Sequence, residues 1–137
     1  MNGRKRLSWE ETAMNLAFKI AEYRSEDLHT QVGCCIIKKD NSIILGYNGA
    51  PSGQEIDWEN REEKRKRVRH AEANALDNVK AGEVKIFCVT HFPCLQCINA
   101  IANKLVNKVY YGMILENYDP EEVFKIAKEY KIDMIQA

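Results

Sequence analysis

Four residues in two short segments could carry out chemistry. In RHAEANA, residues 69–75, His70 precedes Glu72 by two positions, and in HFPCLQC, residues 91–97, Cys94 precedes Cys97 by three. One imidazole and two thiolates give a tetrahedral zinc ion three ligands and leave its fourth position open, as in catalytic rather than structural zinc sites. Glu72 is then close enough to accept a proton from water at the open position.

Each pair also has a simpler interpretation. Cys-x-x-Cys occurs in thiol redox pairs and in structural zinc sites, and an acidic residue in the first turn of a helix commonly interacts with the helix dipole. A structural zinc site would need a second ligand pair, and none stands elsewhere in the sequence. His29, in a turn, and His91, at a strand end, are left out of the ligand set. The combination favours a catalytic site with one zinc ion per chain.

The elements around these pairs follow from hydrophobic periodicity and capping signals. Ser8 and Glu11 form a capping box, and Asp119 with Pro120 predicts an N-cap and a first helical position. The segment 46–53 is a loop rich in Gly, Asn and Pro, and the charged segment 59–69 is a solvated loop or a short helix. Helices are predicted over 8–24, 70–81, 94–105 and 120–130, and strands over 32–39, 42–48, 84–90, 108–115 and 132–136.

The order of these elements predicts an α/β fold in one domain, residues 1–137. The first two strands form a hairpin, and alternating strands and helices after residue 70 predict parallel strands joined by right-handed crossovers. We expect a three-layer α/β/α sandwich around a mixed five-stranded sheet. Helices that begin at His70 and Cys94 can bring their N-termini together at one edge of this sheet, and helix N-termini favour thiolates.

Composition excludes several classes of function. Twenty basic and twenty acidic residues cancel, which argues against a nucleic acid polymer as partner. No apolar run is long enough for a membrane span, and the N-terminus lacks the apolar core of a signal peptide, so we expect a cytoplasmic protein. Five cysteines are an odd number that disfavours a disulfide framework. Cys34, Cys35 and Cys88 stand in apolar runs and are expected to be small buried hydrophobic residues.

The motifs resemble those of zinc-dependent deaminases, whose signature is His-x-Glu followed by Pro-Cys-x-x-Cys. KRLSW, TQVGCCII, GYNGAPSG, HAEANAL and FPCLQC resemble, in this order, segments of the deoxycytidylate (dCMP) deaminase family, especially its compact viral members. The resemblance implies a cytidine deaminase-like fold, zinc held by His70, Cys94 and Cys97 with water as fourth ligand, and Glu72 as the proton carrier. The implied reaction converts dCMP to dUMP and ammonia and supplies dUMP for dTTP synthesis.

The resemblance also implies contacts with the substrate. Asn48 matches an asparagine that contacts the sugar, and Tyr118 matches an aromatic residue that stacks on the base. Ala71, between the ligand and the proton carrier, is expected to contact the substrate as well. Arg24 and Ser25 stand where the family has residues at the mouth of the substrate site. Which residues bind the 5′-phosphate stays open.

Regulation is a further implication of the resemblance. In the family, dCTP with Mg²⁺ activates and dTTP inhibits, and members assemble as homohexamers. Tyr47, Asn48 and Gly49 resemble the effector motif, although an ordinary Asn-Gly turn would have the same sequence. The segment 54–69 is shorter and more charged than in larger members.

Three alternative functions remain at this stage. The chain could deaminate dCTP, free deoxycytidine or a base in RNA or DNA. It could be a non-enzymatic zinc domain that binds nucleotides as a sensor. It could be a thiol redox protein that uses Cys94 and Cys97 without a metal.

Overall fold

The computed structural model describes residues 5–137, and its elements follow the predicted order. The charged segment contributes one additional short helix, which is one of the two alternatives expected for it. The elements are α1 (Trp9–Arg24), β1 (Gly33–Lys38), β2 (Ile43–Tyr47), α2 (Arg61–Arg67), α3 (Ala71–Leu76), β3 (Val84–His91), α4 (Leu95–Asn103), β4 (Lys108–Met113), α5 (Glu121–Glu129) and β5 (Asp133–Gln136).

The five strands form one mixed sheet in the order β2-β1-β3-β4-β5. The predicted hairpin is confirmed, because β1 pairs antiparallel with β2. The predicted parallel arrangement of the second half is also confirmed, since β3, β4 and β5 run parallel to one another. An antiparallel ladder between β1 and β3 joins the two halves of the sheet.

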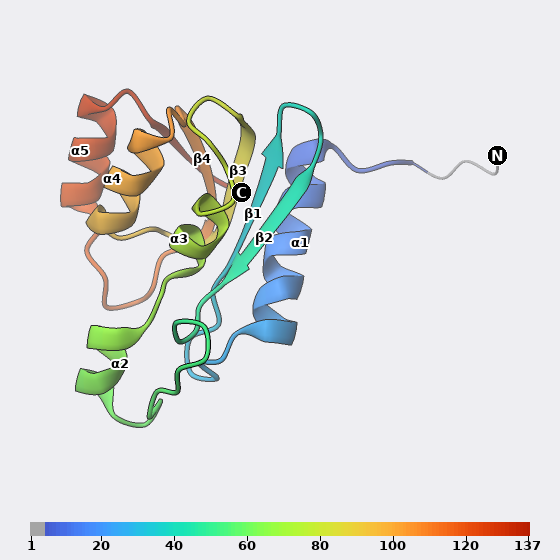
Figure 1. The fold of residues 1–137 in the computed structure, drawn as a ribbon. Coiled ribbons are helices and arrows are strands. Elements are labelled where there is room, and N and C mark those ends of the chain that lie inside the picture. Colours follow the sequence, from blue (N-terminus) through green and yellow to red (C-terminus); the bar gives the residue numbers. More distant parts are fainter. Residues whose placement is uncertain (1–4) are drawn as a thin grey trace.

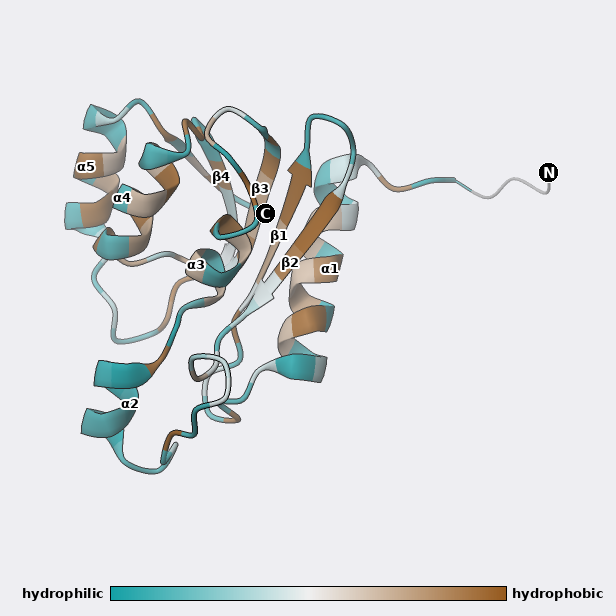
Figure 2. Cartoon of the chain, in the orientation of Figure 1, coloured by the Kyte–Doolittle hydropathy of each residue, from teal (hydrophilic) through white to brown (hydrophobic). Residues whose placement is uncertain are grey.

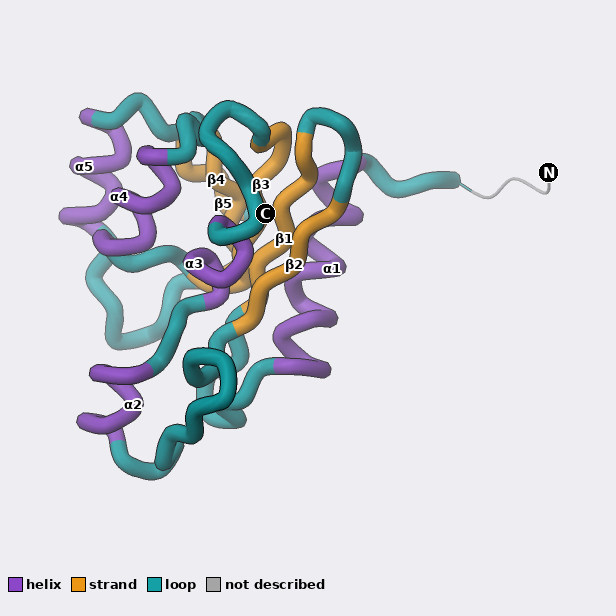
Figure 3. Tube along the Cα trace, in the orientation of Figure 1, coloured by secondary structure: helices purple, strands orange, loops and turns teal. Residues whose placement is uncertain are grey.

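Helices cover both faces of the sheet, as Figures 1 and 3 show. α1 lies on one face, and α3, α4 and α5 lie on the other. β1 lies between β2 and β3 and is buried on both faces. Its side chains alternate between two apolar layers: Cys34 and Ile36 join the core under α3, α4 and α5, whereas Cys35 and Ile37 join the core under α1. A strand buried on both faces is uniformly apolar rather than alternating, which explains the run in the sequence.

The three cysteines of the apolar runs are buried, as expected. Cys34 lies in the larger core, and Cys35 and Cys88 lie in the core beneath α1. Burial raises the pKa of both Cys35 and Cys88 to about 12, so these thiols stay protonated and behave as small apolar side chains.

Helix boundaries differ from the prediction at several ends, most of all at the end of α3. α3 ends at Leu76 rather than near residue 81, because the amides of Asn78 and Val79 bond to carbonyls three residues back and turn Val79 into the core. α5 begins at Glu121 with Pro120 at the N-cap, one residue later than predicted. The Asp119 carboxylate nevertheless accepts from the Glu121 amide at 3.0 Å. The capping box that opens α1 is confirmed.

Among residues 5–137, no helix combines the length and the apolar character that crossing a lipid bilayer requires.

Candidate active site

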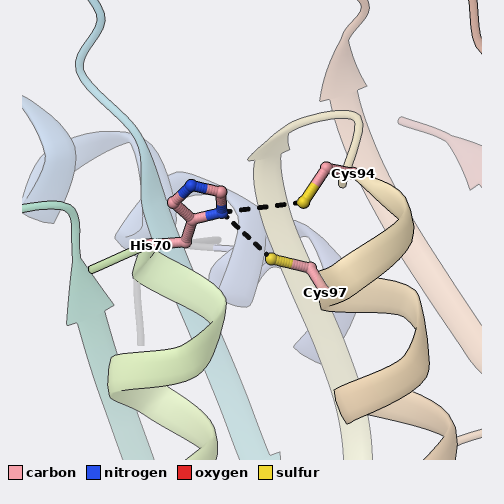
Figure 4. Close-up of side chains that lie close together, drawn as sticks. All are labelled: His70, Cys94 and Cys97. Atoms are coloured by element: carbon pink, nitrogen blue, oxygen red, sulfur yellow. Dashed lines mark hydrogen bonds between the residues drawn. The ribbon is translucent and has the colours of Figure 1, made fainter. Parts of the chain in front are cut away.

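The three predicted metal ligands lie at the beginnings of two helices. His70 is the N-cap residue of α3, Cys94 is the N-cap residue of α4, and Cys97 lies in the first turn of α4. Neither N-cap side chain accepts a capping hydrogen bond from its own helix. Both are therefore free to bind a ligand, and both point into the space between the two helix ends (Figure 4).

The distances between the donor atoms fit a zinc ion. The ligating atoms of His70, Cys94 and Cys97 all lie within 4.8 Å of one another. Nδ1 of His70 is 3.3 Å from Sγ of Cys97 and 3.7 Å from Sγ of Cys94. Tetrahedral ligands with ordinary Zn–N and Zn–S bond lengths are about 3.6 Å apart. Donor types and spacing thus match a zinc site, and within residues 5–137 no other group of three such donors is close enough to share an ion.

Hydrogen bonds within the cluster set its charge. Hydrogen bonding to Cys97 lowers the pKa of Cys94 to about 4, and the same interaction, with burial, raises the pKa of Cys97. Hydrogen bonding to Cys94 raises the pKa of His70 above its usual value. Cys94 therefore favours the thiolate form that a metal ligand needs, whereas Cys97 has to lose its proton when a metal binds.

Glu72 lies beside this cluster, two residues into α3, and is 4% exposed. Burial raises the pKa of its carboxyl group, and its side chain also hydrogen-bonds to Cys97. A carboxyl group whose pKa moves towards neutrality can both accept and release a proton under working conditions. Its environment therefore suits the role of proton carrier.

A cavity of about 260 Å³ opens next to the three donors and Glu72. It lies beyond the carboxyl end of β3, where the sheet changes from antiparallel to parallel pairing, and such positions commonly hold ligands in α/β folds. Phe92 and Tyr118, whose rings are 6.2 Å apart, form part of the apolar wall. The lining comprises Asp27, Thr30, Val32, Asn48, Lys64, Val68, His70, Ala71, Glu72, His91, Phe92, Cys94, Leu115 and Tyr118.

Comparison with known proteins assigns this fold and site to a class. The family model of the cytidine and deoxycytidylate deaminase zinc-binding region matches residues 7–113. A probable deoxycytidylate deaminase of Caenorhabditis elegans is 39% identical over 81% of this chain and 59% of its own length. The deoxycytidylate deaminase of Mus musculus is 36% identical over 88% of this chain and 76% of its own length. The chain belongs to the cytidine and deoxycytidylate deaminase family.

A solved structure agrees with this assignment. The dCMP deaminase of the cyanophage S-TIM5, crystallised in complex with dCMP and dUMP, is 25% identical and superposes with a TM-score of 0.77. The match covers 98% of this chain and 100% of the phage protein. By contrast, the chain spans about three fifths of the nematode relative. The predicted cytidine deaminase-like fold with its mixed five-stranded sheet is therefore confirmed.

Three of the predicted substrate contacts line the cavity, namely Asn48, Ala71 and Tyr118. Asn48 is held firmly: its Oδ1 accepts from the Ser25 hydroxyl at 2.5 Å and from the Val32 amide at 3.0 Å, and its Nδ2 donates to a backbone carbonyl. Ser25 is buried behind Asn48 and acts on the cavity through it. Arg24 does not line the cavity. Its guanidinium lies 5.8 Å from the ring centroid of Tyr47.

The predicted effector residues, at the end of β2 and in the loop that follows it, contact the segments that carry His70 and Glu72. The backbones of Gly49 and Arg69 exchange two hydrogen bonds, of 3.1 and 2.8 Å, which fix the chain one residue before His70. The carbonyl of Tyr47 accepts from the side chain of Asn74, in α3, at 2.7 Å. These contacts give the loop a structural role, and its predicted binding of effectors stays a prediction.

Two charged residues of the cavity were not singled out from the sequence. Asp27 is fully buried, and its carboxylate forms an ion pair with Lys64 of α2. Lys64 belongs to the charged segment 59–69, which was expected to be a solvated loop or a short helix without a role in the site. His91 also lines the cavity, and its Nδ1 is 2.8 Å from the Thr90 hydroxyl. His29, by contrast, contacts Glu59 at an exposed position.

Proposed function

We propose that this chain is a zinc-dependent deaminase that hydrolyses dCMP to dUMP and ammonia. One observation carries the proposal: His70, Cys94 and the buried carboxyl group of Glu72 line one cavity that is large enough for a pyrimidine ring, and the third zinc-type donor, Cys97, lies within 4.8 Å of the other two donors. The names of the relatives, and the dCMP and dUMP bound by the phage enzyme, support the choice of substrate.

Different residues of the site bind the metal and transfer the protons. His70, Cys94 and Cys97 would hold a zinc ion, which would supply the Lewis acidity that makes water a nucleophile at neutral pH. Glu72 would accept a proton from that water and deliver it to N3 of the cytosine ring as the hydroxide adds to C4. It would then take the remaining proton from the new C4 hydroxyl and pass it to the amine, which leaves as ammonia while the C4 carbonyl forms. Burial raises the pKa of Glu72 above its usual value, which makes its carboxylate a stronger proton acceptor.

The remaining lining residues select and orient the substrate. Tyr118 and Phe92 offer apolar ring surface to the pyrimidine. Asn48, fixed by the hydroxyl of Ser25, faces the cavity where a sugar hydroxyl would lie. Ala71, the first residue of α3, brings backbone close to the base. Arg24 is proposed to act from the mouth of the site through its contact with Tyr47.

Regulation by nucleotides belongs to the same proposal. dCTP with Mg²⁺ would activate and dTTP would inhibit, through Tyr47, Asn48 and Gly49. The contacts of this loop with Arg69 and Asn74 support a route from an effector to His70 and Glu72. A homohexamer is proposed as the functional assembly. Turnover measured with and without dCTP and dTTP, together with the mass in solution, tests these points.

The substitution Glu72→Gln tests the catalytic proposal. It keeps the shape of the side chain but removes its ability to carry a proton, so zinc content and thermal stability should stay near wild type. Turnover of dCMP should fall by about 10²-fold or more. A variant that retains wild-type turnover would support a non-enzymatic nucleotide sensor, and a protein purified without zinc but with reactive Cys94 and Cys97 would support a redox function.

A panel of substrates distinguishes between the possible deaminase activities of this chain. Ammonia release should be fastest from dCMP, compared with dCTP, deoxycytidine and single-stranded DNA at equal concentration. Faster ammonia release from single-stranded DNA than from dCMP would show that the substrate is a polymer and not the free nucleotide.

A further inference from the structure

We infer that one face of α2, formed by Arg61, Lys64 and Arg65, binds the 5′-phosphate of the substrate. This inference rests on the proposed function, because it assigns the far end of the same nucleotide. The three residues and Val68 follow helical spacing, at positions i, i+3, i+4 and i+7, and together line a hollow on the surface. We call Arg61, Lys64 and Arg65 the basic face.

The charges of α2 are segregated between its two sides. Figure 2 shows α2 as hydrophilic along its length, and the helix has no buried residue. On the opposite side, Lys66 pairs with Glu62 at 3.4 Å and Arg67 pairs with Glu63 at 3.6 Å. Within residues 5–137, neither Arg61 nor Arg65 forms an ion pair, so the basic face carries uncompensated positive charge in a protein of zero net charge.

The basic face adjoins the zinc cavity. Lys64 and Val68 line both the cavity of the three donors and the hollow of the basic face, so the two spaces meet at these side chains. Lys64 is held at this border by its ion pair with Asp27, whose side chain is 1% exposed. A cation anchored on a buried carboxylate has little freedom to move, which is the condition for a defined anion site.

The charges also fix the direction in which a nucleotide enters. Glu72 lines the zinc cavity but not the hollow of the basic face, and a carboxylate at that position disfavours a phosphate dianion. Arg61 and Arg65 line the hollow but not the zinc cavity, and their guanidinium groups can bind phosphate oxygens through paired N–H groups. The pyrimidine therefore lies at Glu72 and the phosphate lies at α2.

A pair of double substitutions tests the basic face. Arg61→Gln with Arg65→Gln removes two charges from it, and Lys66→Gln with Arg67→Gln removes two charges from the other side of the same helix. The two variants have equal net charge and similar long-range fields. Lys64 is left unchanged, since its loss would leave the buried Asp27 unpaired.

The measurements are the Kd of dUMP and of deoxyuridine, and kcat/KM with dCMP, for the wild type and both variants. The first variant should raise the Kd of dUMP and lower kcat/KM by about tenfold or more, equal to ~1.4 kcal/mol, and should change the Kd of deoxyuridine by less than about twofold. The second variant should stay within about twofold of wild type for all three quantities.

Other results overturn the inference. Equal losses in both variants would indicate a general electrostatic effect, and unchanged dUMP affinity in the first variant would place the phosphate elsewhere. If the first variant kept its affinity for dUMP but was no longer activated by dCTP, the basic face would bind the triphosphate of an effector instead of the substrate phosphate. A wild type that binds dUMP through this face but does not deaminate dCMP would refute the proposed function and leave the phosphate site standing.

Discussion

The substitution Gly46→Ala tests whether the close contact between β2 and α3 positions the active site. Gly46 lies in β2, and a Cβ atom at this position would be 2.3 Å from the carbonyl oxygen of Ala71 and 2.7 Å from the amide nitrogen of Ala75. Both atoms belong to the backbone of α3, which cannot rotate away as a side chain can. α3 therefore has to move as a whole, and it carries Glu72 and follows directly after His70.

The size of the movement follows from the contact distance. An ordinary contact begins at 3.4 Å, so the helix has to move by about 1.1 Å, the difference between 3.4 and 2.3 Å. Overpacking of this kind costs about 1–3 kcal/mol of stability. A displacement of about 1 Å at a catalytic group costs on the order of 10²-fold in rate. The His70–Cys97 separation of 3.3 Å would change as well, which weakens zinc binding.

The measurements are urea unfolding, zinc content after dialysis, and kcat/KM with dCMP. Gly53→Ala is the control, because Gly53 has a φ of +78° and nothing within 4 Å of its Cβ position. The control should lose about 1 kcal/mol of stability through backbone strain and keep its zinc and its turnover. If Gly46→Ala kept wild-type zinc content and turnover, the contact between β2 and α3 would not position the site.

Two further predictions concern the metal and the pH dependence of stability. Cys97→Ala should purify with less than one zinc ion per chain. EDTA should lower the Tm of the wild type but not of this variant, because only the wild type is stabilised by bound zinc. Burial lowers the pKa of His91 below its usual 6.5. The unfolded chain therefore binds more protons between these two pKa values, and the contribution of His91 to stability is complete above pH 6.5 and declines as pH falls through the folded pKa. Urea unfolding at pH 5 and pH 8 should show a smaller difference for His91→Gln than for the wild type.

The sequence predicted the order and type of the main elements because their signals are local. The Ser8–Glu11 capping box, the apolar runs of the strands and the periodicity of the long helices each act within a few residues. The end of α3 could not be predicted in this way. Residues 77–81 are compatible with a helix, but burial of Val79 turns the chain after Leu76, and this burial depends on the completed core.

The candidate site likewise combines residues with a local sequence signal and residues that only the completed fold brings together. The zinc donors could be recognised because each pair is close in the sequence and its residue types have few other uses together. The residues that complete the cavity come from distant segments: Asp27 follows α1, and Lys64 lies in α2. Their ion pair has no signature in either segment. The spacing of Arg61, Lys64 and Arg65 was visible, but a charged helix surface is usually only solvated, so spacing alone could not assign it.

The ladder between β1 and β3 has a consequence for folding. The β1–β2 hairpin and the packing of α1 on it involve nearby residues, whereas pairing of Cys34 with Val89 closes a much longer loop, and closing a longer loop costs more chain entropy. His70 follows the hairpin, and Cys94 follows β3. The ladder between β1 and β3 therefore joins the two parts of the chain that carry the donors, and a chain in which this ladder has not formed lacks the sheet that holds the ligands together. Metal retention during refolding thus reports on formation of the whole sheet rather than on either half.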